Sequence, residues 1–214
     1  MSLKIFERIL REECKKDYED IRSGKRIIRL QKKRDERNSM KDIIKPRIDT
    51  ADIIESCLRT FGNTMQKASL LYAKKQGAKI LNGKFGRIEI DNLWEFHNVV
   101  YNFESKLNIN LDKGKSRETK NELHDKLKAI EYSFRNEVEI ISGILIWTKA
   151  SGDEAKKIAK SPLKNIDMFG YRDFFNIFGI IITDDMYEEM IRRVWGEEIM
   201  GDNGRENLEY YEKK

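Results

Sequence analysis

The residues that could act as soft metal ligands or as nucleophiles are few and far apart in the sequence. There are two histidines, His97 and His124, and two cysteines, Cys14 and Cys57. Their spacing matches no zinc site, because such sites combine closely spaced Cys or His pairs. No serine lies in a nucleophile-elbow pattern, and the glycine loop at residues 82–86 lacks the spacing of a phosphate-binding loop. The sequence therefore predicts a protein with no cofactor, no metal and no catalytic residue.

Basic side chains give the strongest functional signal. From Arg22 to Arg47 there are 11 Lys or Arg against three acids, whereas Asp184 to Glu212 has ten acids against three Arg. This asymmetry would suit the anionic surface of a microtubule, a nucleic acid or a membrane, but no membrane partner is expected; the alternative is that both segments are solvated helical faces. The residues expected to bind the partner lie in the basic segment: Lys25, Arg26, Arg29, Lys32, Lys33, Arg34 and Arg37. Trp195, near the end of an expected helix, is a possible anchor for a protein partner.

The composition indicates that the chain, including the basic segment, is mainly helical. The chain has 214 residues, 39% hydrophobic and 37% charged, with two prolines and 13 glycines. Few helix-breaking residues and a high charge are typical of long solvated helices. No apolar run approaches the ~20 residues of a membrane span, and the first residues lack a signal-peptide pattern. We expect a cytoplasmic protein with reduced cysteines.

Apolar periodicity predicts a series of helices. The first is a long helix from residue 3 to about 37, with a possible break at Ser23-Gly24. Further helices are expected at residues 50–62, 64–79, 93–103, 122–132, 142–149, 171–178 and 186–195. Short extended pieces are expected around Ile48, Ile88, Ile140 and Phe169. The spacing of 40 residues between Ile48 and Ile88 indicates an internal repeat.

This arrangement of helix, loop, short extended piece and helix resembles the EF-hand family. Residues 47–62 look like the end of a loop and the outgoing helix of one hand, and residues 85–96 look like the next, with Gly86 at the sharp turn. Residues 171–196 are similar to the last hand and terminal helix of calcyphosin-like proteins. The resemblance implies an all-α fold of paired EF-hand-like lobes with very short β pieces, plus a long basic N-terminal helix.

The expected domains follow from the resemblance and from composition. They are a basic helical arm (1–40), a first EF-hand-like lobe (41–107), a linker (108–120), a second lobe (121–200) and a mobile acidic tail (201–214). None of the expected loops carries the carboxylates that calcium requires at the first, third, fifth and twelfth positions. The scaffold is therefore expected to be independent of calcium.

Three functions are compatible with the sequence. The first is a non-catalytic structural or adaptor protein that binds a protein partner. Because calcyphosin-like proteins often belong to cilia, the resemblance implies tubulin or another axonemal partner and a place in the cilium or flagellum axoneme. The second is a basic, all-helical nucleic-acid-binding protein, possibly viral or from a phage, although the basic segment lacks interleaved aromatic residues. The third is a regulatory subunit that docks on an enzyme.

Overall fold

The structure, a computed structural model, describes residues 3–23, 25–36, 50–90, 92–107, 113–134, 138–159, 163 and 166–200. These residues form two compact units. We call residues 1–6 and 65–184 the sheet unit, and residues 7–64 and 185–214 the helical unit. Within the described residues, no helix is long and apolar enough to cross a membrane.

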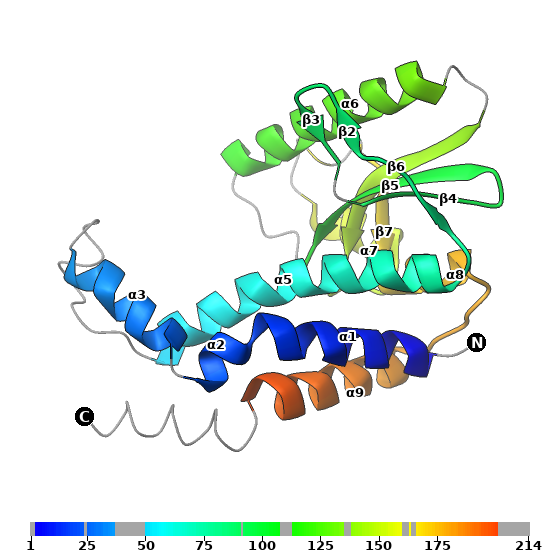
Figure 1. The fold of residues 1–214 in the computed structure, drawn as a ribbon. Coiled ribbons are helices and arrows are strands. Elements are labelled where there is room, and N and C mark those ends of the chain that lie inside the picture. Colours follow the sequence, from blue (N-terminus) through cyan, green and yellow to red (C-terminus); the bar gives the residue numbers. More distant parts are fainter. Residues whose placement is uncertain are drawn as a thin grey trace. The chain divides into compact units, whose positions relative to one another are not determined.

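The sheet unit is built around a mixed five-stranded sheet in the order β1-β4-β5-β6-β7 (Figure 1). The strands are β1 (Lys79–Ile80), β4 (Leu93–Phe96), β5 (Val99–Lys106), β6 (Glu139–Ile146) and β7 (Met168–Gly170). The pairs β1–β4 and β4–β5 are antiparallel, and β5–β6 and β6–β7 are parallel. Strands β2 (Lys84–Phe85) and β3 (Ile88–Glu89) form a separate hairpin. The fold is α/β, and the prediction of all-α EF-hand-like lobes was wrong.

The hairpin of β4 and β5 replaces the helix expected at residues 93–103. The apolar residues there fit a helical period, but they also alternate about a two-residue turn, and strands favour their aromatic and β-branched side chains. His97 and Asn98 form that turn with positive φ values of 50° and 63°. Positive φ at both central residues is typical of tight hairpin turns that match the twist of the strands. The register that follows pairs Trp94 with Tyr101.

A helical crossover joins the parallel strands. Helix α6 (Lys113–Phe134) connects β5 to β6, and α7 (Gly152–Ile158) lies between β6 and β7 in the chain. Parallel neighbours need such a crossover, because a tight turn cannot reverse the chain twice. The expected linker 108–120 thus overlaps the start of α6, and the helix expected at 142–149 is mostly strand β6. The short run expected around Ile140 is extended, but it belongs to a full-length strand that pairs with β5.

The two faces of the sheet have different cores. On one face, α6 and α7 pack on β6 and β7 through Leu123, Ile144, Ala155 and Met168. The other face is aromatic and includes the start of α1 (Leu3–Asp17), the end of α5 (Thr50–Lys75) and α8 (Tyr171–Ile177). Its rings form one continuous cluster: Phe6, Tyr72, Trp94, Tyr101, Phe103, Trp147, Phe174, Phe175 and Phe178. The sheet unit is thus a three-layer α/β/α arrangement.

The helical unit contains most of α1, α2 (Glu19–Arg22), α3 (Lys25–Asp35), the first part of α5, most of α9 (Asp184–Val194) and a π-helical turn at Trp195–Met200. The N-terminal helix is interrupted after Arg22, as its Ser-Gly pair indicates. Helix α5, however, continues through Gly62, where two helices were expected. Ion pairs from Arg193 to Glu7 (3.0 Å) and from Arg11 to Glu197 (2.5 Å) join α1 to α9 and to the π-helical turn.

The EF-hand arrangement fails at each extended piece that the structure describes. Ile88 lies in the β2–β3 hairpin, Ile140 lies in β6, and Phe169 lies in β7. The last two share the large sheet, and Ile88 pairs with Phe85, three residues earlier in the sequence. The piece around Ile48 and the tail from Gly201 lie outside the described residues. Short β-prone runs between helices therefore marked two parallel strands and one strand of a hairpin, and not the loops of paired hands.

Gly143 tests the parallel β6–β7 pairing. A Cβ at this position would lie 2.3 Å from the backbone oxygen of Asp167 and 2.7 Å from the Phe169 ring. We expect Gly143→Ala to lower the free energy of unfolding by about 2–3 kcal/mol, since a backbone oxygen cannot move aside without breaking the ladder. Gly196→Ala is the matched control, because a Cβ there meets nothing within 4 Å. Urea denaturation compares the two; equal stabilities would contradict this β6–β7 geometry.

Candidate functional site

A charged cluster lies on the α6 face of the sheet, at the carboxyl end of β5. Glu104 and Lys106 are two residues apart on this strand, so both side chains point to the same face. The Glu104 carboxylate accepts from the Lys106 ammonium at 2.9 Å and from the Lys126 ammonium of α6 at 2.8 Å. We call Glu104, Lys106 and Lys126 the Glu–Lys triad.

Helix α6 presents Lys126 to the sheet because of its place in the apolar stripe. Leu123 and Ile130 are buried one turn before and one turn after it, against separate hydrophobic clusters. Lys126 lies between these clusters, and its side chain is 15% exposed. The helix therefore carries a cation toward the sheet where its pattern would otherwise place an apolar residue. A lysine at such a position is retained only if an anion meets it.

The triad keeps Glu104 ionised. Burial alone would raise the pKa of this carboxyl group, but the hydrogen bonds from Lys106 and Lys126 outweigh burial and hold the pKa below its ordinary value. Glu104 is thus a permanent anion near neutral pH and not a general acid. Its oxygens are suited to binding a cation, and the two ammonium groups are suited to binding an oxyanion.

The lowered pKa predicts a specific dependence of stability on pH. A carboxyl group whose pKa is lower in the folded state stabilises the fold above its unfolded pKa, and this contribution is lost as the pH falls through the folded pKa. The difference in unfolding free energy between wild type and Glu104→Gln should therefore narrow as the pH falls below about 4.5, the ordinary pKa of a glutamate. Urea denaturation at a series of pH values measures this difference. A difference that stays constant with pH would contradict the ionised triad.

Polar groups continue from the triad along the same face. The Asn102 amide donates to the Ser142 hydroxyl at 2.9 Å. Ser142 also lines a cavity of about 200 Å³ between α6 and β6, together with Lys120, His124 and Asp167. Leu127, the residue after Lys126, lines it too. This cavity, with Lys120 and His124 in its lining, could receive a phosphate group or the leaving group of a phosphate ester.

One more aspartate is close to the triad in the sequence. The backbone N–H of Phe103, the residue before Glu104, donates to the backbone oxygen of Asn92 at 3.3 Å. Asp91 precedes Asn92 and lies outside the described residues. Among the described residues, no group of three or more His, Cys, Asp or Glu side chains could enclose a metal ion. Magnesium is usually held by one or two carboxylates together with substrate phosphates, and Glu104 would serve as one such carboxylate only after Lys106 and Lys126 leave its two oxygens.

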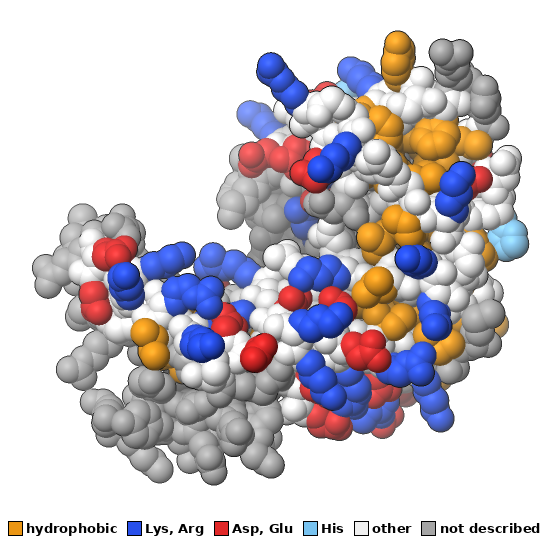
Figure 2. All heavy atoms as spheres, viewed as in Figure 1, with side chains coloured by type: hydrophobic (Ala, Val, Ile, Leu, Met, Phe, Trp, Pro, Cys, Tyr) orange, Lys and Arg blue, Asp and Glu red, His pale blue; other side chains and the backbone are white. Residues whose placement is uncertain are grey.

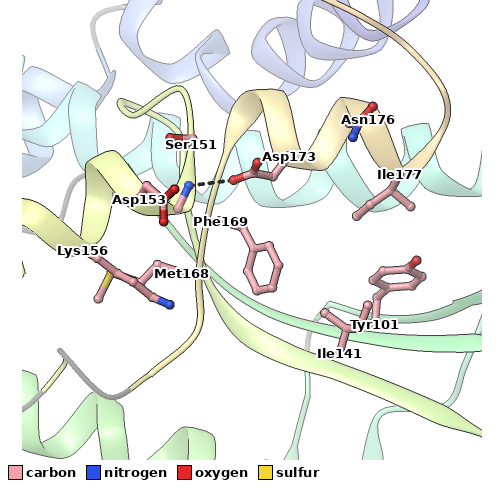
Figure 3. A pocket seen from close by; sticks show the side chains of 11 residues that line it. Tyr101, Ile141, Ser151, Asp153, Lys156, Met168, Phe169, Asp173, Asn176 and Ile177 are labelled. Atoms are coloured by element: carbon pink, nitrogen blue, oxygen red, sulfur yellow. Dashed lines mark hydrogen bonds between the residues drawn. The ribbon is translucent and has the colours of Figure 1, made fainter.

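A second cavity, of about 370 Å³, opens beside α7 and α8 (Figure 3). Tyr101, Ile141 and Phe169 form its apolar side. Asp173 accepts from the backbone N–H groups of Gly152 (2.7 Å) and Gly170 (2.8 Å), so one of its oxygens is engaged in holding α7 to α8. Acidic Asp153 and basic Lys156 give the rim a mixed charge (Figure 3). This cavity has no pair of cations and is less suited to an anion than the triad.

The residues predicted to bind a partner have different environments in the helical unit. Lys25, Lys32 and Lys33 are exposed on α3, and Arg29 is exposed and paired with Asp20 at 2.5 Å. Arg26 is buried; it pairs with Asp20 at 2.8 Å and donates to Thr60 at 3.0 Å, so it holds helices together. The side chain of Arg34, and Arg37 altogether, lie outside the description. Trp195 is half-buried and packs edge-to-face on Phe61.

The histidines and cysteines are not brought together. His97 forms the β4–β5 turn and His124 lies at the cavity on α6. Cys14 and Cys57 are buried free thiols, and burial raises the pKa of Cys57 to about 11, although Arg26 opposes this shift. A thiol with so high a pKa is a poor nucleophile at neutral pH.

Sequence reasoning missed the triad. Its signal was an acid and a lysine two residues apart, Glu104-Ser105-Lys106, in a stretch expected to follow a helix. In a strand this spacing puts both on one face; in a helix it does not. Lys126 joins them only through the crossover. No protein-family model matches the chain, and neither does any curated protein or solved structure. The class that the fold and site define is a mixed α/β protein with an ionised glutamate between two lysines.

Proposed function

We propose that the protein binds nucleic acid and hydrolyses its phosphodiester bonds with the help of magnesium at the Glu–Lys triad. The observation that carries this proposal is the ionised Glu104 carboxylate, placed between two ammonium groups at the carboxyl end of a strand with a parallel neighbour. Ligands of open α/β sheets bind outside the carboxyl ends of the strands. A carboxylate for the metal and cations for the phosphate are the groups that phosphoryl chemistry requires.

The charge of the chain supports a polyanionic substrate. The net charge is +5 at pH 7, and the pI is about 9.0. Around the triad, α6 adds exposed Lys120 and Lys128. Figure 2 shows lysine and arginine side chains together with aspartate and glutamate side chains in the region of α6 and the β2–β3 hairpin. Binding at phosphates supplies most of the sequence-independent affinity for a nucleic acid.

Each residue of the triad has a role in the proposed reaction. Magnesium held by Glu104 would act as a Lewis acid and lower the pKa of a bound water. Lys106 and Lys126 would leave the carboxylate and neutralise the charge that develops on the phosphate oxygens. Water would add to phosphorus and release a proton to solvent, the bond from phosphorus to the leaving sugar oxygen would break, and that oxygen would take up a proton from solvent.

The proposal departs from the function expected first from the sequence. A non-catalytic adaptor for tubulin or another axonemal protein, with a place in the cilium, remains an untested prediction. It was implied by an EF-hand scaffold, and the fold is of another class. The alternative, a nucleic-acid-binding protein, agrees with the charge of the chain. The Glu–Lys triad adds the proposed hydrolysis of phosphodiester bonds to nucleic-acid binding.

The test is an assay of the full chain with labelled single-stranded DNA, duplex DNA and RNA, in Mg²⁺ and in excess EDTA. We expect a salt-dependent shift in electrophoresis in both conditions and shortened products in Mg²⁺ alone. Intact substrates in both Mg²⁺ and Mn²⁺ would contradict the hydrolytic activity. Absence of any shift at low salt would contradict nucleic-acid binding as well.

A further inference from the structure

A largely apolar groove lies between the β2–β3 hairpin and α6, the helix that carries Lys126 of the triad. Its volume is about 560 Å³. Phe85 and Ile88 line it from the hairpin, and Lys128, Ala129 and Tyr132 line it from α6. Tyr132 is 88% exposed, so its ring stands at the rim. In Figure 1 the hairpin lies alongside α6.

The base of the groove is fixed by the core of the sheet unit. Gly86 has a φ of +61° in the turn, which few other residues adopt. At the base of the hairpin the backbone N–H of Ile90 donates to the Gly83 oxygen at 2.9 Å. Phe85 and Ile88 pack on the buried cluster that contains Ile90, Leu93 and Ile130. The groove is therefore a preformed feature, and Tyr132 is the exposed aromatic on it.

We infer that this groove stacks one unpaired base of the nucleic-acid strand that is bound at the Glu–Lys triad. The inference rests on the proposed function and names its substrate class, a single strand or an unpaired segment. The exposure of the Tyr132 side chain leaves its ring open to solvent. An exposed ring of this kind offers a base a π-face, and such stacking does not depend on base sequence.

Charge and position select a nucleic-acid strand as the occupant. Exposed Lys128 lies one helical turn before Tyr132 and lines the groove together with Asp125, and exposed Lys84 lies opposite Glu89 in the hairpin. These cations suit the phosphates on either side of a stacked base. Tyr132 follows Lys126 by six residues, about 9 Å along the helix. A strand whose phosphate is held at the triad therefore reaches the groove within a few nucleotides. A base inside a duplex is already stacked and paired, so it cannot enter without being extruded.

The test compares Tyr132→Ala with Tyr132→Phe in the full chain. Fluorescence anisotropy in EDTA measures binding to a fluorescein-labelled single strand and to a labelled duplex without cleavage. We expect Tyr132→Ala to weaken single-strand binding by about tenfold or more, because stacking by one base is lost. Tyr132→Phe keeps the ring and should bind like the wild type, and duplex binding should change little in either variant. Ile181→Ala removes another highly exposed apolar side chain and serves as the control.

The outcomes separate this inference from the proposed function. Unchanged single-strand binding by Tyr132→Ala, with cleavage still dependent on Glu104, would overturn the stacking groove alone. An equal loss for the duplex would also overturn it. Absence of binding by the wild-type protein would overturn both. If Tyr132→Ala instead converted a dimer to a monomer in size-exclusion chromatography, the groove would be a contact between two copies, and the inference would be wrong.

Discussion

Glu104→Gln should reduce magnesium-dependent cleavage of nucleic acid by on the order of a thousandfold. Glutamine has nearly the same shape as glutamate, but its neutral amide cannot replace an anionic oxygen as a magnesium ligand. The two lysines that contact Glu104 keep their positive charge, so binding of the nucleic acid should persist or strengthen. Loss of cleavage with retained binding is the expected signature, measured by electrophoresis of products beside anisotropy in EDTA.

Glu95→Gln is the matched control for this variant. Glu95 lies on the adjacent strand β4 and pairs with exposed Lys79 at 3.6 Å, in a surface contact that contributes little to stability. Cleavage should be unchanged in this variant. If Glu104→Gln cleaved as fast as Glu95→Gln, the triad would be a structural ion cluster and the proposed activity would have no site. Cleavage by the Asp91→Asn variant tests whether the aspartate that precedes Asn92 in the sequence contributes to the activity.

The lysines of the triad should behave differently from the carboxylate. Lys126→Ala and Lys106→Ala remove cations that would contact phosphate, so each should weaken binding as well as cleavage and reduce the salt dependence of binding. A variant that lost cleavage without any change in salt dependence would place that lysine away from the phosphate.

Phe174→Ala should be the most destabilising single change in the sheet unit, at about 3–5 kcal/mol of unfolding free energy. The side chain is fully buried, and its ring centre lies 5.2 Å from that of Trp147, 5.3 Å from Phe175 and 5.5 Å from Phe178. Truncation to alanine leaves a cavity in the middle of this cluster, where several neighbouring rings lose contacts at once. Urea denaturation, followed by tryptophan fluorescence, measures the loss.

Phe174→Leu and Ile181→Ala are the comparison variants for this prediction. Leucine fills most of the volume, so its cost should be clearly smaller than that of alanine. Ile181 is 89% exposed, and its truncation should change stability by less than about 0.5 kcal/mol. A Phe174→Ala variant as stable as Ile181→Ala would contradict the position of α8 on the sheet.

The sequence predicted the helices better than the sheet. Residues 171–178 and 186–195 are helical close to the expected bounds, and the N-terminal helix is interrupted near its Ser-Gly pair. The error lay at residues 93–103, where Leu93, Phe96, Val100 and Phe103 have helical spacing, whereas Trp94, Phe96, Tyr101 and Phe103 alternate with polar residues along two strands. The hairpin forms because His97 and Asn98 adopt positive φ in its two-residue turn. Their left-handed conformation depends on strand pairing and is not visible in composition.

The site could be predicted only in part. Glu104 and Lys106 stand two residues apart in the sequence, and their shared face follows once the segment is known to be a strand. The third member, Lys126, comes from a helix whose position over β5 is set by the parallel crossover. That placement depends on tertiary packing, so no local pattern contains it. The basic segment at Lys25–Arg37 could be recognised in the sequence because its charges are close together, whereas the charges of the triad are dispersed along the chain.

The most direct test of the triad is a crystal structure of the wild-type protein soaked with Mn²⁺ and a non-hydrolysable single strand of nucleic acid. We expect an anomalous peak within coordination distance of the Glu104 carboxylate, with the Lys106 and Lys126 ammonium groups moved onto a phosphate. Glu104 still bonded to both lysines, with no metal beside it and the strand bound elsewhere, would contradict the proposed function.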